Sequence, residues 1–311
     1  MLIVFQSILP IFLIVLLGIA LKRSPVINPT FWDGLEQFSY WVLFPSLLFQ
    51  TMAHADFTNT ENLSVSFAAI LTVCVMSGAI LGLWPVLQRM GVRAPAYSSL
   101  FQTATRWNGF VALAIAAKTS GHEGLTMIGM VMAAIIIPQN LTIIIVLVWF
   151  SGRARSYKMM FYRVVTNPMI VATALGIVVN LLHIPVYDPV MQAVYFLSEA
   201  ALSLGLITVG AGLRVMDALK PSLLALLAVF LKLAVFPVVA VSIGLGLGLH
   251  GTALTMLALS AAVPTAMNGY IMAKQFNADA DFYAAVATIQ VIISFFTIPI
   301  VLTIAPYVAG G

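Results

Sequence analysis

The sequence predicts an all-α integral membrane protein of ten transmembrane helices, built as two inverted five-helix repeats with broken, crossing helices at positions four and nine. Three observations lead to this prediction. Hydrophobic residues make up 62% of the chain and charged residues only 8%, whereas a soluble domain carries roughly 25% charged residues. Apolar runs of spanning length alternate with short polar or proline- and glycine-rich segments. Landmark residues of the first half recur in the second at a nearly constant spacing.

The apolar runs set the number of spans. A helix needs about 20 apolar residues to cross the hydrocarbon layer. The first run has Lys22 and Arg23 after it rather than before it, the reverse of a secretory signal, so we expect a retained helix. The ten runs are 2–21, 35–53, 64–88, 97–117, 123–150, 166–182, 190–213, 221–249, 252–273 and 282–307.

The basic residues predict the orientation, because lysine and arginine concentrate in short cytoplasmic loops. With ten spans, this places both termini on the external face of a multi-pass protein in the cell membrane. The basic residues lie between apolar runs rather than in one stripe, which argues against nucleic acid as a partner. Eleven of the fourteen fall in odd-numbered loops: Lys22, Arg23, Arg89, Arg93, Arg153, Arg155, Lys158, Arg163, Arg214, Lys220 and Lys274.

The two halves repeat each other in order. Pro10 matches Pro168 at a spacing of 158 residues, and Asn108 matches Asn268 at 160. We therefore predict one five-helix repeat over 1–155 and a second over 156–311. Five crossings are an odd number, so the second copy enters the membrane upside down, as in many secondary transporters.

Spans four and nine carry the predicted substrate site. Each has an Asn-Gly pair near its middle, and Pro264 and Thr265 precede the second pair. Proline removes a backbone donor and glycine loosens a helix, so both spans are expected to break there. Freed N–H groups and helix N-termini favour an anion, and asparagine offers a donor and an acceptor. The predicted ligands are Asn108, Gly109, Asn268, Gly269, Pro264 and Thr265.

Three charged residues lie deep within predicted spans. Arg106 is about 14 Å from the cytoplasmic end of span four, at 1.5 Å per residue, and its planar guanidinium suits a carboxylate. A structural ion pair or a contact with backbone carbonyls is the alternative. Glu199 and Lys232 have similar depths on consecutive spans, so a buried ion pair is expected, with proton uptake by Glu199 as the functional alternative.

Catalytic and metal-binding signatures are missing from the sequence. It has no HExxH, no GxSxG and no clustered cysteine and histidine ligands. We therefore expect neither an enzyme nor a metal site, and no cofactor, with the coupling ion, H⁺ or Na⁺, left open.

The chain resembles the auxin efflux carrier family, including bacterial members described as malonate or other organic-acid permeases. The resemblance covers the full length and is strongest in FPSLLFQTMA, ATRWNGFVALAIAAKTSG and LSAAVPTAMNGYIMAKQFNAD. It implies a fold like that of the bile-acid sodium symporters, with scaffold helices 1, 2, 6 and 7, transport helices 3–5 and 8–10, and an elevator-like movement. It also implies a carboxylate-type solute and a homodimer formed through the scaffold helices. Span four has Ala104 or Trp107 where plant members have proline.

Together these features predict secondary active transport of a small organic-acid anion by alternating access. Two other functions remain open at this point. One is a membrane sensor that binds a metabolite without moving it, and the other is a sodium-coupled symporter for a different anionic solute.

Overall fold

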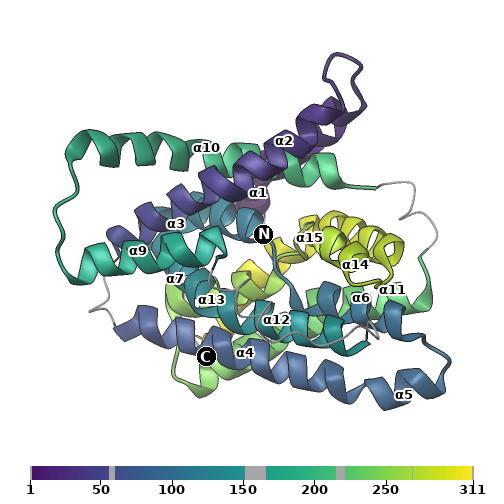
Figure 1. The fold of residues 1–311 in the computed structure, drawn as a ribbon. Coiled ribbons are helices and arrows are strands. Elements are labelled where there is room, and N and C mark those ends of the chain that lie inside the picture. The colour runs from purple at the N-terminus through teal and green to yellow at the C-terminus, as the bar shows by residue number, and fades with distance from the viewer. Residues whose placement is uncertain (1, 56–59, 151–165, 215–220, 268, 310–311) are drawn as a thin grey trace.

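The computed structural model describes residues 2–55, 60–150, 166–214, 221–267 and 269–309. These residues form helices joined by short connections, with no strand among them (Figure 1). The helices are α1 Leu2–Arg23, α2 Thr30–Phe38, α3 Phe44–Ala53, α4 Thr60–Gly82, α5 Trp84–Arg89, α6 Ala94–Thr105, α7 Gly109–Phe150, α9 Pro168–Leu181, α10 Asp188–Gly212, α11 Leu223–Phe230, α12 Phe236–Gly246, α13 Gly251–Ala262, α14 Gly269–Gln275 and α15 Ala280–Ala309.

Several helical stretches are long and apolar enough to cross a membrane. Among the described residues there are five: Glu61–Arg89, Ala94–Phe150, Asp188–Gly212, Leu223–Gly246 and Ala280–Tyr307. The second contains the non-helical segment 106–108 and a kink at Gly121, whose φ of 58° departs from helical values. Two shorter apolar helices, Pro168–Leu181 and Gly251–Ala262, add to these. The loops that carry Arg153 to Arg163 and Lys220 lie outside the described residues, so the predicted orientation stays a prediction.

Two short π-helical segments interrupt helices that the sequence predicts as regular. Segment η1, Ser39–Leu43, precedes Phe44-Pro45, and η3, Leu231–Val235, precedes Phe236-Pro237. Proline has no N–H to bond the carbonyl four residues back, so the ladder widens ahead of it. The N–H of Phe44 donates to Ser39 and that of Phe236 to Leu231, five residues back in each case.

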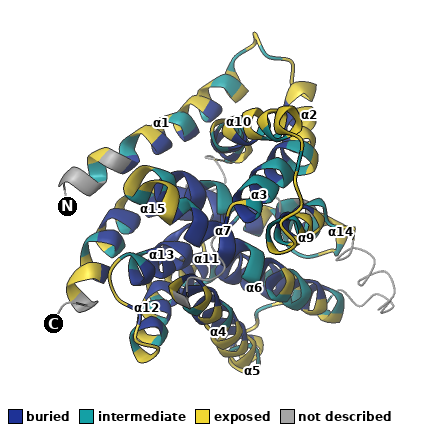
Figure 2. Ribbon diagram, turned by 90° about the vertical axis from the view of Figure 1, so that its left-hand side faces the viewer, coloured by how far each residue is buried: buried dark blue, intermediate teal, exposed yellow. Residues whose placement is uncertain are grey.

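The helices pack as two groups. Helices α1, α2, α3, α9 and α10 contact one another, and α4, α6, α7 and α11 to α15 contact one another, with α7 and α15 also reaching the first group. In Figure 1 the first group lies at the top and left and the second below it and to its right. Buried residues are concentrated on α6, α7 and α13 (Figure 2).

Close backbone contacts hold the first group together at glycines. A Cβ added to Gly210 of α10 would collide with the Val15 carbonyl oxygen of α1 and lie 2.8 Å from its carbonyl carbon. A Cβ added to Gly176 of α9 would lie 2.8 Å from the Phe49 carbonyl oxygen of α3. Small residues allow such approaches between membrane helices. The pairs α1–α10 and α3–α9 therefore pack backbone to backbone.

The second group joins distant parts of the chain. The Ser99 hydroxyl of α6 donates to the Asp279 carbonyl oxygen at 2.7 Å, and the Asp279 N–H donates to the Pro95 carbonyl oxygen at 3.1 Å. The start of α6 is thereby fixed to the start of α15, about 180 residues later in the sequence.

Candidate functional site

The chain leaves the helical conformation at 106–108, between α6 and α7. Arg106 ends α6 in an extended conformation, with ψ of 154°. Asn108 then caps α7, because its Oδ1 accepts the Val111 N–H at 3.3 Å. The Asn108 side chain is fully buried, and its Nδ2 has no hydrogen-bond partner among the described residues. The side-chain oxygen of Asn108 therefore caps α7, while its side-chain NH₂ group remains available to donate to a solute.

A second break separates α13 from α14 at 263–268. Pro264 cannot donate to the Ser260 carbonyl, and the Thr265 N–H donates instead to Gln290 Oε1 at 2.9 Å, so α13 ends. Pro264, Thr265 and Gly269 are all buried. Asn268, the predicted counterpart of Asn108, lies outside the described residues.

Gln290 of α15 connects the second break to the end of α6, just before the first break. Its Oε1 accepts from Thr265, and its Nε2 donates to the Thr103 carbonyl oxygen of α6 at 3.0 Å and to the Ala228 carbonyl oxygen of α11 at 3.4 Å. Thr265 Oγ1 also lies 3.0 Å from the hydroxyl of Tyr283, which donates to the Ala266 carbonyl oxygen. The two breaks therefore lie close together in the second helix group.

Arg106 points into this region rather than toward the membrane surface. Its side chain is 6% exposed, and Nη2 lies 2.7 Å from Met272 Sδ of α14 and 3.5 Å from Asn140 Oδ1 of α7. Gly109, the first residue of α7, faces the side chain of Met132. The N-terminus of α7, an arginine and an amide donor thus occur within four residues, a combination that favours an anionic ligand.

The predicted ion pair between Glu199 and Lys232 is absent from this structure. Glu199 is exposed on α10, whereas Lys232 is fully buried in η3. Segment η3 packs against α6, α13 and α15. The Lys232 ammonium lies 4.2 Å from the Phe236 ring centroid, and its Nζ has no hydrogen-bond partner among the described residues. Similar depth in the membrane did not place the two residues face to face, because their helices belong to different groups.

Lys232→Met is expected to leave the protein folded and to raise its melting temperature, with a gain of about 1 kcal/mol or more. A buried charge without a carboxylate partner costs free energy that an apolar side chain of similar length avoids. Thermal unfolding in detergent measures the change, with Glu199→Gln as the control, for which we expect a change within about 0.5 kcal/mol. A large loss of stability in Lys232→Met would show that the ammonium is paired in the native protein.

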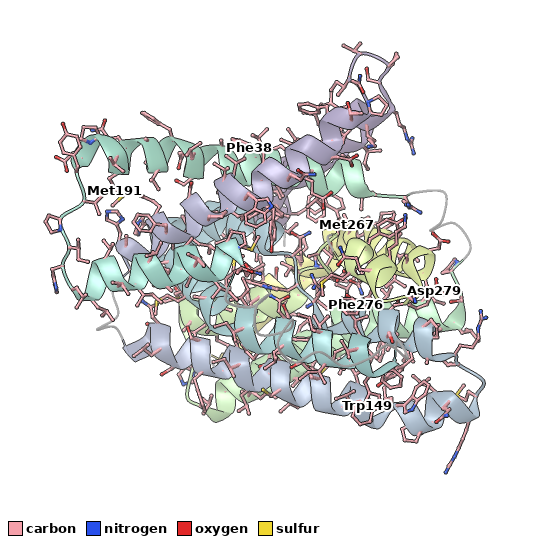
Figure 3. The ribbon with its side chains drawn as sticks, in the orientation of Figure 1. Phe38, Trp149, Met191, Met267, Phe276 and Asp279 are labelled. Atoms are coloured by element: carbon pink, nitrogen blue, oxygen red, sulfur yellow. The ribbon has the colours of Figure 1, made fainter. Side chains whose placement is uncertain are left out.

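Residues in or next to the two breaks also face the first helix group. The Phe110 ring, next to Gly109, packs on Phe44 of α3 with centroids 3.4 Å apart and fills the space beside Gly205 of α10. Met267, in the second break, lies between α10 and α14 (Figure 3), where a Cβ added to Gly212 would be 3.4 Å away. The breaks therefore lie along the boundary between the two helix groups.

Four polar residues of this region are missing from the predicted ligands. Each is a polar side chain within an apolar run, the signal that singles out Arg106 and Asn108. Gln102 is fully buried with neither amide atom bonded among the described residues, and Gln139 Nε2 donates to the Thr105 carbonyl oxygen at 2.6 Å. The full set is Gln102, Gln139, Tyr283 and Gln290.

Comparison with known proteins agrees with these features. The model of a family described as "Membrane transport protein" matches residues 151–302. The second half of the chain is thus similar to membrane transport proteins. It is also 26% identical over 301 residues to a protein described as "Uncharacterized transporter" from Methanothermobacter thermautotrophicus, covering 95% of this chain and 96% of the relative. Both findings bear out the resemblance to the auxin efflux carrier family, and they indicate transport by a multi-pass membrane protein rather than catalysis.

Proposed function

We propose that this transporter carries a small organic-acid anion across the bilayer by alternating access, and that the anion binds at the two helix breaks. The observation that carries the proposal is the Asn108 amide, fully buried with its Nδ2 unbonded among the described residues. A buried donor without a partner costs free energy. A carboxylate oxygen would satisfy it, assisted by the N-terminus of α7 and the Arg106 guanidinium.

The helix packing supports an inverted repeat over 1–155 and 156–311. In the ten-span numbering, α1 packs on α10, a pairing of spans one and seven, and α3 packs on α9, a pairing of spans two and six. Spans one and two of the first repeat correspond to spans six and seven of the second. Exchanging the two repeats therefore converts one pairing into the other. The same relation holds for α7 on α13, a pairing of spans five and nine, and α6 on α15, a pairing of spans four and ten. Two inverted copies of one unit account for these matched contacts.

The two helix groups support the expected division into a scaffold and a transport unit. The group of α1, α2, α3, α9 and α10 comprises spans 1, 2, 6 and 7 and would be the scaffold. The group that contains both breaks comprises spans 3–5 and 8–10 and would move against it as an elevator. The contacts that fix α6 to α15 and Gln290 to both breaks suit a unit that moves as one body.

Ligand-induced thermal stabilisation tests the proposal. A ligand at 100 times its Kd adds about 2.7 kcal/mol to the folded state, so mono- and dicarboxylates are screened on the purified protein. The stabilisation should be largely lost in Asn108→Ser and Asn268→Ser. Serine keeps the N-cap of α7 but has no amide, so the melting temperature without ligand should change little.

Two outcomes would contradict this assignment. Undiminished stabilisation in both serine variants would place the anion elsewhere, and the absence of stabilisation by every carboxylate would point to a neutral or cationic solute. Uptake into proteoliposomes then separates a carrier from a membrane sensor, which binds without uptake. Uptake that requires a Na⁺ gradient would instead favour a sodium-coupled symporter.

A further inference from the structure

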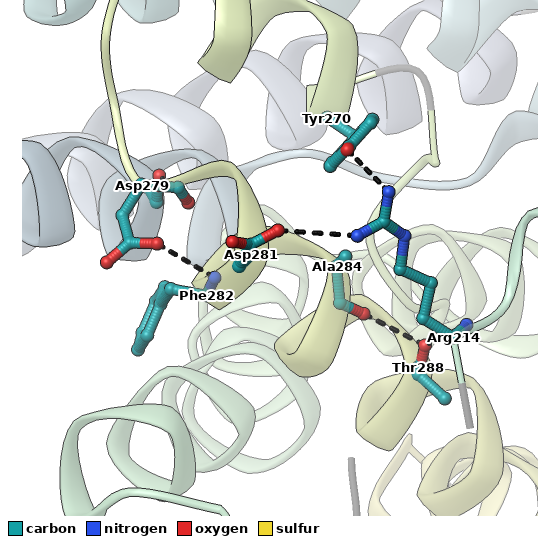
Figure 4. A network of polar contacts seen from close by, with 8 residues as sticks. Arg214, Tyr270, Asp279, Asp281, Phe282, Ala284 and Thr288 are labelled. Atoms are coloured by element: carbon teal, nitrogen blue, oxygen red, sulfur yellow. Dashed lines mark hydrogen bonds and ion pairs between the residues drawn. The ribbon is translucent and has the colours of Figure 1, made fainter. Parts of the chain in front are cut away.

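Arg214 forms a polar network where α10 ends (Figure 4). Its Nη1 lies 3.3 Å from Asp281 Oδ1, its Nη2 donates to the Tyr270 hydroxyl at 2.5 Å, and its guanidinium carbon lies 4.4 Å from the Tyr270 ring centroid. The Arg214 backbone N–H also donates to Thr288 Oγ1 at 3.0 Å. One residue therefore makes backbone, charge and aromatic contacts at the same time.

The partners of Arg214 all belong to the other helix group. Arg214 directly follows α10 of the first group, whereas Tyr270 lies on α14 and Asp281 and Thr288 lie on α15. Tyr270 also follows the second Asn-Gly pair immediately, as Phe110 follows the first. Both aromatic residues contact α10 or its end, Phe110 beside Gly205 and Tyr270 at Arg214.

The two contacts differ in kind. Phe110 meets α10 through apolar surface without a directional bond, in the space beside Gly205. The Arg214 network is directional and holds one relative position. It is also accessible to water, because the side chain of Arg214 is 41% exposed and that of Asp281 is 87% exposed. Water can replace exposed ion-pair contacts at little cost, so the network can break without stranding buried charge.

We propose that the Arg214–Tyr270–Asp281 network is a releasable lock that holds the mobile helix group in one end position against the scaffold and breaks in each transport cycle. The inference rests on the proposed function, since it takes the two helix groups as scaffold and mobile unit. Thr288 positions the lock by fixing the Arg214 backbone, and the guanidinium closes it on Tyr270 and Asp281. Loss of the lock shifts the population toward the other position.

Distance measurements between two spin labels test the lock in the full-length protein in liposomes. With Cys74→Ser as background, labels are attached at Val26→Cys, in the connection between α1 and α2, and Met90→Cys, beyond α5. Val26 is 87% exposed and Met90 74% exposed. The unaltered network should give one dominant distance. Arg214→Gln and Asp281→Asn should each add a population displaced by about one helical turn, ~5 Å.

The controls separate release of a lock from general damage. The double variant Arg214→Gln/Asp281→Asn should give no larger shift than Arg214→Gln alone, because loss of the guanidinium already removes its contact with Asp281. Glu123→Gln removes another exposed carboxylate of the mobile group, outside the network, and should leave the distance unchanged. Should Arg214→Gln fail to fold, Asp281→Asn and Tyr270→Phe remove the same lock from the other side.

Distances in Arg214→Gln and Asp281→Asn that match those of the unaltered protein would overturn the lock, as would additive shifts in the double variant. A different result would contradict the proposed function, namely that no carboxylate stabilises the protein in the thermal assay. A distance that responds to Arg214 while no carboxylate binds would retain the lock and reject the solute class.

Discussion

Gly210→Val is expected to prevent stable assembly of the first helix group, with a loss of about 3 kcal/mol or more in the free energy of unfolding. A Cβ at this position would collide with the Val15 carbonyl oxygen and lie 3.1 Å from the Gly18 Cα, so the backbones of α1 and α10 must move apart. Overpacking costs about 1–3 kcal/mol where neighbouring side chains can move aside. Backbone atoms move less easily, so the cost here should be at the upper end of this range or above it. The measurement is the melting temperature and the monodisperse fraction after gel filtration in detergent.

Gly78→Ala is the matched control for this change. Gly78 lies inside α4, and a Cβ added there meets no atom within 4 Å. Alanine is a better helix former than glycine by about 0.5–1 kcal/mol, so this variant should be slightly more stable. Equal behaviour of Gly78→Ala and Gly210→Val would mean that the contact between α1 and α10 contributes little to the scaffold.

Gln290→Leu is expected to lower the free energy of unfolding by about 2–4 kcal/mol and to weaken carboxylate binding. The substitution leaves the Thr265 N–H without its acceptor and the carbonyl oxygens of Thr103 and Ala228 without their donor. Each unsatisfied buried group costs about 1–3 kcal/mol, although hydrogen bonds between membrane helices average about 0.6 kcal/mol. Binding should weaken because both breaks lose their common support.

Gln139→Leu provides the comparison, since Gln139 makes one hydrogen bond to this region, to the Thr105 carbonyl oxygen. We expect a loss of about 1 kcal/mol there, with carboxylate stabilisation largely retained. Comparing the stability and carboxylate binding of the two variants tests whether Gln290 maintains the conformation of the breaks. A Gln290→Leu protein as stable as Gln139→Leu, with full ligand stabilisation, would show that the breaks keep their conformation without Gln290.

The apolar runs and their interruptions were sufficient to predict the helical fold and the location of the breaks. The break at 106–108 includes Asn108 of the Asn-Gly pair in span four, and the break at 263–268 includes Pro264. The local causes are visible in the sequence, because proline and an N-capping asparagine act within one helical turn. The π-helical segments were predictable in principle from Phe44-Pro45 and Phe236-Pro237.

Contacts between distant helices could not be predicted in the same way. Depth along a helix gives the level of a residue but not the direction of its side chain, which is why Glu199 and Lys232 were paired and are in fact apart. Gln290 had no local pattern that tied it to Thr103, 187 residues earlier. Only the assembled helices bring its amide to both breaks. The roles of Asn108 and Arg106 in binding remain predictions for the same reason.

The hydrogen bonds between α6 and α15 have a consequence for biosynthesis. The backbone of the first half near Pro95 and Thr103 finds its partners at Asp279 and Gln290, which the ribosome makes much later. Until then these carbonyl groups face lipid, neighbouring helices or water, at a cost in hydrocarbon. A chain truncated before α15 would lack these partners, so we expect it to be less stable than the full-length protein.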